Sequence, residues 1–296
     1  MKQQLSAFFE KERLSLWGVA PMTPDLLSSP ERLRRARLCL DGDDAAPEGG
    51  FRVRSLLVIC VPYFAGYPEN FSAYAAVPDY HAYYAGLFSR LEPVLREIWP
   101  RANFAFFADK SPFRETLAAE RAGLGSPGDN HLFLTEDYSS FVFLGEAASD
   151  LSPEEWELPG RTAPALCLHC GACRRACPGY FDGETFVCLS ALTQKKGALT
   201  EKEKERLRRL GSVWGCDVCQ KVCPVTKNAA ARGTLETPIG YFRQDRIERL
   251  DYNTLAALDD EAFARRAFAW RKRETVLRNL EILYGPDECT KEETPC

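Results

Sequence analysis

The sequence predicts an α+β protein with a mixed α/β segment over residues 1–160, a cysteine-rich segment over 161–235 and a short helical segment over 236–296. Three observations support this order. Strand-like and helix-like stretches alternate in the first 150 residues, eight of the 12 cysteines lie within residues 167–223, and apolar residues recur at helical spacing after residue 253. The composition, with 45% apolar and 27% charged residues, excludes a disordered or collagen-like chain.

Local patterns place the elements of the first segment. Apolar, β-rich runs predict strands over residues 55–63, 103–108 and 140–144, and the stretch 80–98 is helical. A second helix is predicted over residues 112–122, with Ser111 as N-cap, Pro112 at the first position and Gly123 as its stop. The proline-containing stretch 151–164 marks a domain boundary.

The last segment has helical periodicity over residues 253–284. We expect its apolar residues to form a buried stripe, consisting of Leu255, Leu258, Phe263, Phe268, Val276, Leu277 and Leu280.

The chain contains no apolar run of the roughly 20 residues needed to cross a bilayer, and its N-terminus does not resemble a secretory signal. We therefore expect a cytoplasmic protein without a membrane partner. Since cytoplasmic thiols stay reduced, the clustered cysteines favour metal ligation over disulfides.

The cysteine spacing identifies the metal centre. Cys167, Cys170, Cys173 and Cys177, with Pro178, reproduce the C-x2-C-x2-C-x3-C-P run of bacterial two-cluster ferredoxins, in which the fourth cysteine ligates the other cluster. A ferredoxin-like domain with two 4Fe-4S clusters is therefore predicted, and the second run supplies three more cysteines. Cys188, between the two runs, is the natural eighth ligand.

The predicted ligand sets use all eight thiolates. Cluster one takes Cys167, Cys170, Cys173 and Cys223, and cluster two takes Cys177, Cys188, Cys216 and Cys219. The alternative is a pair of zinc sites, which also use C-x2-C spacing but do not require the overlapping triple or the prolines that follow Cys177 and Cys223. The other cysteines have no motif partners and are expected to be buried apolar residues or surface thiols: Cys39, Cys60, Cys289 and Cys296.

Charge also marks this segment. Residues 161–235 carry 13 Lys and Arg against 6 Asp and Glu, within a chain of net charge −4. Each oxidised cluster with its four thiolates carries a charge of about −2, so two clusters offset part of this excess. What remains is weak evidence for nucleic-acid binding.

Other cofactor motifs are absent or fail on context. Residues 123–128 match G-x-G-x-x-G in letters, but they follow a predicted helix and contain Pro127, so we interpret them as a helix stop and turn. There is no phosphate-binding P-loop and no C-x3-C-x2-C run of the radical S-adenosylmethionine type.

Several motifs together resemble the epoxyqueuosine reductase family. The stretch 107–112, with Asp109, Ser111 and Pro112, is followed by Glu115, residues 122–125, Asn130 and residues 143–146, which end at Glu146. Further matches are the Asp-Tyr-His of residues 79–81 and the cysteine-containing stretches 188–193 and 214–220, and the resemblance extends into residues 263–280. It covers nearly the whole chain.

The resemblance implies a reductase that converts epoxyqueuosine to queuosine at the wobble position of tRNA, using cob(I)alamin reduced through the two clusters. The α/β domain would hold the cobalamin, with Ser190 and Thr193 beside it and Asp109 as both cobalamin contact and proton donor. The implied partners are a tRNA anticodon stem-loop and an electron donor such as ferredoxin or flavodoxin, and we expect a monomer.

A proton donor at neutral pH needs a pKa raised above the usual value of about 4 for aspartate, which burial in an apolar pocket can provide. We expect Phe104, Phe106 and Phe107 to supply such a pocket around Asp109. His81 is either a structural histidine or a second acid. His169, between two cluster ligands, is expected to tune the cluster by hydrogen bonding.

One stretch departs from the family pattern and keeps two other hypotheses open. Residues 126–129 (Ser-Pro-Gly-Asp) replace the aromatic and basic residues that the family usually has in a stretch expected near the substrate. The first alternative is a corrinoid and iron–sulfur reductase of another substrate, similar to reductive dehalogenases. The second is an electron-transfer subunit that binds no corrinoid.

Overall fold

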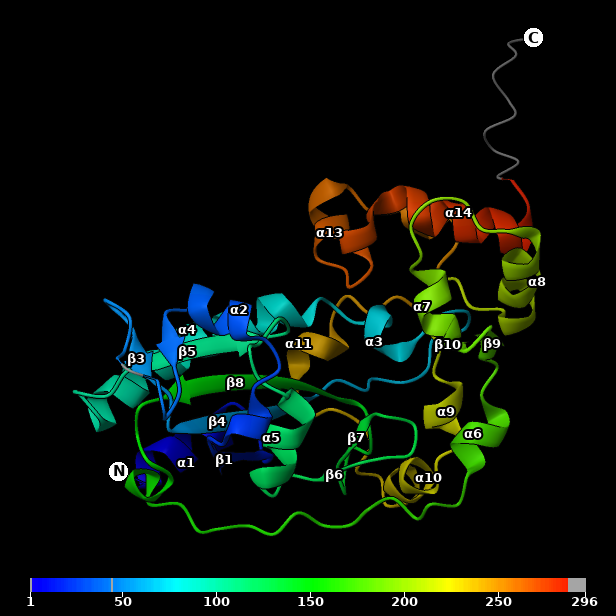
Figure 1. Cartoon of the computed structure of the whole chain (residues 1–296). Coiled ribbons are helices and arrows are strands. Elements are labelled where there is room, and N and C mark those ends of the chain that lie inside the picture. The colour runs from blue at the N-terminus through cyan, green and yellow to red at the C-terminus, as the bar shows by residue number, and fades with distance from the viewer. Residues whose placement is uncertain (1, 44, 287–296) are drawn as a thin grey trace. The chain divides into compact units, whose positions relative to one another are not determined.

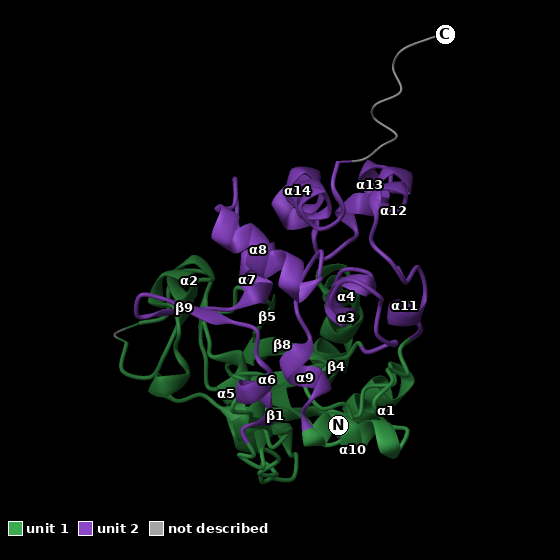
Figure 2. Ribbon diagram, turned by 90° about the vertical axis from the view of Figure 1, so that its right-hand side faces the viewer, with its two compact units in different colours: residues 1–63, 80–170, 224–239 green, residues 64–79, 171–223, 240–296 purple. Residues whose placement is uncertain are grey.

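The computed structural model describes residues 2–43 and 45–286. The chain divides into two compact units, coloured separately in Figure 2: unit 1 comprises residues 1–63, 80–170 and 224–239, and unit 2 comprises residues 64–79, 171–223 and 240–296. We expected three consecutive segments with boundaries at residues 160 and 235. The two compact units do not follow this order, because the core of unit 2 is completed by stretches that are far apart in the sequence.

Unit 1 is built on a four-stranded antiparallel sheet with the strand order β1-β4-β8-β5 (Figure 1). Its strands are β1 (Trp17–Pro21), β4 (Ser55–Pro62), β8 (Val142–Ser149) and β5 (Phe104–Ala108). All eight residues of β4 are buried, as expected for a central strand whose two faces are covered. The continuous apolar run in the sequence has the same cause.

Most predicted elements of this unit are confirmed. Strands β4 and β5 and helix α4 (Tyr80–Ile98) agree with the predictions at residues 55–63, 103–108 and 80–98. The third strand was expected to end at Leu144, but β8 continues to Ser149. Gly145, the next residue, lies under the ring of Tyr84 from α4, and a Cβ there would come within 2.2 Å of that ring.

Helix α5 (Glu115–Arg121) is shorter than the predicted helix over residues 112–122. Ser111 is not its N-cap, because its hydroxyl donates a hydrogen bond of 2.5 Å to Glu146 and accepts one from the backbone N–H of Phe113. The predicted stop is confirmed, since Gly123 has a φ of +74°, a conformation that favours glycine.

The remaining elements of unit 1 surround the sheet. The helices are α1 (Lys2–Lys11), α2 (Pro30–Arg35) and α10 (Pro224–Ala231), and short 3₁₀ turns cover Pro24–Leu26 and Pro153–Trp156. Two small two-stranded sheets pair β2 (Leu38–Cys39) with β3 (Phe51–Arg52) and β6 (Ser126–Pro127) with β7 (Phe133–Leu134).

Unit 2 consists mainly of short helices. These are α3 (Ala73–Ala76), α6 (Ala172–Ala176), α7 (Leu189–Thr193), α8 (Glu201–Leu210), α9 (Val218–Lys221), α11 (Gly240–Arg243), α12 (Tyr252–Ala257), α13 (Asp260–Ala264), a 3₁₀ turn at Ala269–Arg271 and α14 (Lys272–Tyr284). Strands β9 (Tyr180–Asp182) and β10 (Thr185–Val187) form a hairpin. Within residues 2–43 and 45–286, no helix is both long and apolar enough to span a membrane.

The core of unit 2 joins three distant stretches, for it contains Phe71, Trp214 and Phe268. Six members of the predicted C-terminal stripe contribute to this core, with Leu258 only partly buried, but Leu277 does not and is 37% exposed. The predicted continuous helix is broken into α12, α13 and α14. Leu277 shares α14 with the buried Val276 and Leu280, so its exposure depends on its position around that one helix.

Candidate functional site

Asp109 lies directly after strand β5, where the chain turns sharply. Asp109 and Lys110 both have left-handed φ values, +58° and +52°. Such a conformation is uncommon for residues other than glycine and indicates local strain. One carboxylate oxygen of Asp109 lies 3.7 Å from Nε2 of His81, near the start of α4, and the two side chains are 51% and 48% exposed. An acid and an imidazole are therefore presented together at an accessible edge of unit 1.

Aromatic packing holds this edge in place. The ring of Tyr80 stacks on that of Phe143 at 4.3 Å and lies 4.1 Å from that of His81. Phe143 in turn stacks on Tyr63, at 4.2 Å. The start of α4 is thus fixed against β8 and the residue that follows β4.

The phenylalanines of β5 do not form the expected apolar pocket around Asp109. Phe104 packs against Trp156, Phe106 against Phe88 and Phe107 against Phe113. The carboxyl group of Asp109 is half exposed instead. Strand alternation explains the difference, because side chains along β5 point to the two faces of the sheet and not toward its end.

Two glutamates, Glu115 and Glu146, each have a buried carboxyl oxygen close to the Asp109 turn, and neither has a role predicted from the sequence. Burial raises the pKa of Glu146 in β8 to about 8, helped by the nearby Glu115, while its bond with Ser111 acts against the shift. Burial and the charge of Asp109 raise the pKa of Glu115 in α5 to about 7 against the opposing effect of Arg32. A glutamate inside an apolar strand was the available sequence signal, since isolated buried carboxylates are costly.

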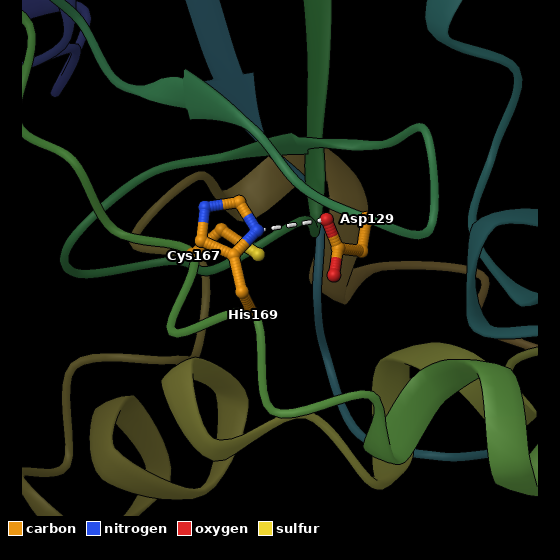
Figure 3. Close-up of side chains that lie close together, drawn as sticks. All are labelled: Asp129, Cys167 and His169. Carbon is orange, nitrogen blue, oxygen red and sulfur yellow. Dashed lines mark hydrogen bonds and ion pairs between the residues drawn. The ribbon is translucent and has the colours of Figure 1, made fainter.

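A second polar cluster joins Asp129, Cys167 and His169, whose potential ligand atoms all lie within 4.8 Å of one another (Figure 3). Nδ1 of His169 lies 2.9 Å from a carboxylate oxygen of Asp129, and the backbone of His169 is left-handed, with a φ of +48°. Ser126, at the start of the same unusual stretch, accepts a hydrogen bond from the N–H of Leu166. Residues 126–129 thus contact the segment around the first predicted cluster ligand.

Four predicted ligands of unit 2 are brought together. The thiol of Cys219 interacts electrostatically with those of Cys216, Cys177 and Cys188, which is the set predicted for cluster two. Burial and these neighbouring thiols raise the pKa of Cys219 to about 12, and burial also raises that of Cys216. None of the ten cysteines within the described residues is joined to another by a disulfide. A group of four neighbouring thiols matches the number of ligands that a 4Fe-4S cluster requires.

Among the cysteines without motif partners, the two that the structure describes are buried, as one of the two expected alternatives. Cys39 and Cys60 are buried, with 4% and 0% exposure. Cys289 and Cys296 lie outside the described residues.

Ser190 and Thr193 lie on α7, directly after Cys188. Thr193 is fully buried, and its hydroxyl donates to the carbonyl of Ser190 and accepts from the N–H of Gly215. The side-chain amide of Asn279 donates to the carbonyl of Thr193. Thr193 therefore ties α7 to the residue before Cys216, while Ser190 keeps part of its surface exposed.

The chain is similar to several known proteins. Residues 166–226 match a family described as a 4Fe-4S double cluster binding domain. An epoxyqueuosine reductase of Listeria monocytogenes is 32% identical over 221 residues, which cover 70% of this chain and 54% of that protein. An epoxyqueuosine reductase of Gloeobacter violaceus is 30% identical over 237 residues, covering 76% of this chain and 72% of that protein. The chain thus spans just over half the length of the Listeria relative.

The fold is shared as well. A crystal structure of epoxyqueuosine reductase with an epoxyqueuosine-modified tRNA-Tyr stem loop has a TM-score of 0.70 at 19% identity, covering 95% of this chain and 80% of that one. The motifs, the double-cluster match and the extent of the similarity to the Gloeobacter relative lead to one assignment: this chain belongs to the epoxyqueuosine reductase family.

Proposed function

We propose that this protein reduces epoxyqueuosine to queuosine in tRNA, with Asp109 as the acid. The observation that carries the proposal is the Asp109 carboxyl, presented next to His81 at the end of β5 in a chain of this family. Opening an epoxide releases an alkoxide, which is a poor leaving group until it is protonated. The half-exposed carboxyl group of Asp109 is within reach of a substrate.

The thiols described above support the predicted iron–sulfur ligation. Cluster two would be held by Cys177, Cys188, Cys216 and Cys219, which share one environment in unit 2. For cluster one, the sequence run assigns Cys167, Cys170, Cys173 and Cys223. Cobalamin is proposed from family membership, with Asp109 and Ser190 as the accessible contacts. Thr193, which is buried, would hold α7 and its Ser190 in place. Together these groups would supply low-potential electrons to the substrate.

The chain's own residues then handle the protons. Removing the epoxide oxygen as water takes two electrons and two protons. Asp109 would give its carboxyl proton to the oxygen that is released, and His81, 3.7 Å away, would stabilise the resulting carboxylate. Both side chains are reachable from solvent, which can return the proton. The tRNA-bound relative supports an anticodon stem-loop as the partner. We also infer an external donor such as ferredoxin or flavodoxin, a monomeric state and a cytoplasmic location.

Reconstitution followed by an activity assay tests the proposal. Protein loaded without oxygen with iron, sulfide and cobalamin is expected to retain about eight irons and one cobalt per chain. It should then convert an epoxyqueuosine-bearing tRNA stem-loop in the presence of a strong reductant. Asp109→Asn should abolish turnover while iron and cobalt remain bound. Asp137, whose side chain is 50% exposed, gives a matched control, and Asp137→Asn should remain active.

Each other outcome has a definite meaning. Retention of iron without cobalt would overturn the proposal in favour of an electron-transfer subunit. Cobalt binding without turnover of the tRNA would indicate a corrinoid reductase of another substrate, which the unusual residues 126–129 would favour. Full activity of Asp109→Asn would show that another group is the acid.

A further inference from the structure

The turn from Asp109 to Phe113 is held from its buried side by side chains of two other elements. Its two left-handed residues, Asp109 and Lys110, are costly to maintain unless the surroundings fix them. The carbonyl of Pro112, within the turn, accepts hydrogen bonds from the N–H groups of Ser28 and Ser29. These anchor the end of the turn but leave its start, at Asp109, to other groups.

Glu115 provides the anchor at Asp109. The charge and the backbone N–H of Asp109 both act on the pKa of this carboxyl group, so the Glu115 carboxyl lies close to the start of the turn. One oxygen of Glu115, Oε1, is buried and has no hydrogen-bond partner. Arg32 and Asp109 are the charged groups that act on it most strongly. A buried carboxyl oxygen without a hydrogen-bond partner destabilises the fold, so the presence of Glu115 here indicates a function beyond packing.

Glu146 provides a second anchor from strand β8. One of its oxygens accepts the 2.5 Å hydrogen bond from Ser111, whose hydroxyl oxygen accepts from the N–H of Phe113. The side chain is fully buried, and its other oxygen also lacks a partner. The charge of Glu115 raises the pKa of Glu146, so the two carboxyl groups lie near each other.

We propose that Glu115 and Glu146 are positioning residues that clamp the Asp109–Phe113 turn from below and so keep the Asp109 carboxyl next to His81. This inference rests on the proposed role of Asp109 as the acid. Because their pKa values are raised, Glu146 is mostly protonated and Glu115 is about half protonated near neutral pH, which reduces the buried charge of the clamp. The hydrogen bonds that link Glu146, Ser111 and Phe113 hold the strained backbone of the turn. The half-exposed carboxyl group of Asp109 thereby keeps one orientation toward its substrate.

Amide hydrogen exchange of the cofactor-loaded protein tests the clamp without any substrate. In Glu115→Ala, the start of the turn loses the carboxyl group that lies beside the Asp109 amide, and this amide should exchange about tenfold faster. Glu115→Gln keeps a carbonyl oxygen at the same place and should stay close to the wild-type rate. For the second anchor, Glu146→Ala should speed exchange at Phe113, whereas Glu146→Gln should not. Unchanged exchange in both alanine variants would overturn the proposal.

Steady-state kinetics then test whether the clamp serves Asp109. Glu115→Ala and Glu146→Ala should lower kcat by about tenfold to a hundredfold with little change in KM for the tRNA stem-loop, and the glutamine variants should restore most of it. Glu120→Gln, the same substitution elsewhere in α5, serves as control and should leave kcat unchanged. Faster exchange without any loss of kcat would refute the positioning role. If wild-type protein does not reduce the substrate, the proposed function fails, while the exchange result still decides whether the clamp exists.

Discussion

Replacing Glu146 by glutamine should change how the stability of unit 1 depends on pH. Burial raises the pKa of this carboxyl group from 4.5 to about 8 in the folded protein. The folded state therefore holds the proton more tightly than the unfolded chain. The resulting stabilisation is fully present below pH 4.5 and is lost as the pH rises from there through 8. Glutamine has the same shape and no charge, so the variant lacks this dependence.

The magnitude follows from the displacement of the pKa. At about 1.4 kcal/mol per pKa unit, the full shift corresponds to about 5 kcal/mol. Between pH 5.5 and 8, the wild-type protein should lose about 3 kcal/mol more of its free energy of unfolding than Glu146→Gln does. Glu115, whose pKa is also raised, is present in both proteins, so its own titration is common to the two curves.

Native-state hydrogen exchange of the β4 and β8 amides measures this free energy without removing cofactors. The rates are corrected for the intrinsic pH dependence of exchange and compared at several pH values between 5.5 and 8.5. The gap between variant and wild type should widen steadily toward high pH. Two parallel curves separated by a constant amount would refute the reasoning, because they would mean that Glu146 keeps the same charge in the folded and unfolded states throughout this range.

Two further substitutions test the four neighbouring thiols of unit 2 and the packing of the sheet in unit 1. Cys219→Ala should reduce the iron bound after anaerobic reconstitution by about four atoms per chain, whereas Cys60→Ala, in the core of unit 1, should retain it; equal iron in both would exclude Cys219 as a ligand. Gly145→Ala should destabilise the protein by about 1–3 kcal/mol in a thermal melt, because the new methyl group would overlap the Tyr84 ring. Gly160, with no atom within 4 Å of an added Cβ, is the control, and an unchanged melting temperature for Gly145→Ala would contradict the packing.

The altered stretch at residues 126–129 makes contacts that its sequence did not indicate. Asp129 contacts His169, and Ser126 accepts a hydrogen bond from the backbone N–H of Leu166. Both contacts join residues 40 positions apart. A change of residue type in this stretch can thus accompany a change near Cys167, a relation that no local pattern in the sequence reveals.

Local chemistry determined much of this protein from its sequence. Strand β4 and helix α4 could be predicted because the side chains that a strand or helix buries recur at a fixed spacing along the sequence. The cysteine runs predicted a double-cluster domain because four-iron clusters require thiolates at short, regular intervals.

Only the tertiary structure decided which polar groups meet. His81 lies beside Asp109 in the folded protein. Ser111, which the sequence predicted to be a helix N-cap, donates a hydrogen bond to Glu146 instead. Folding also brings Glu115 and Glu146 near each other from a helix and a strand. The physical reason is that the charge state and partners of a buried group depend on everything packed around it, and those neighbours come from parts of the chain that only folding brings together.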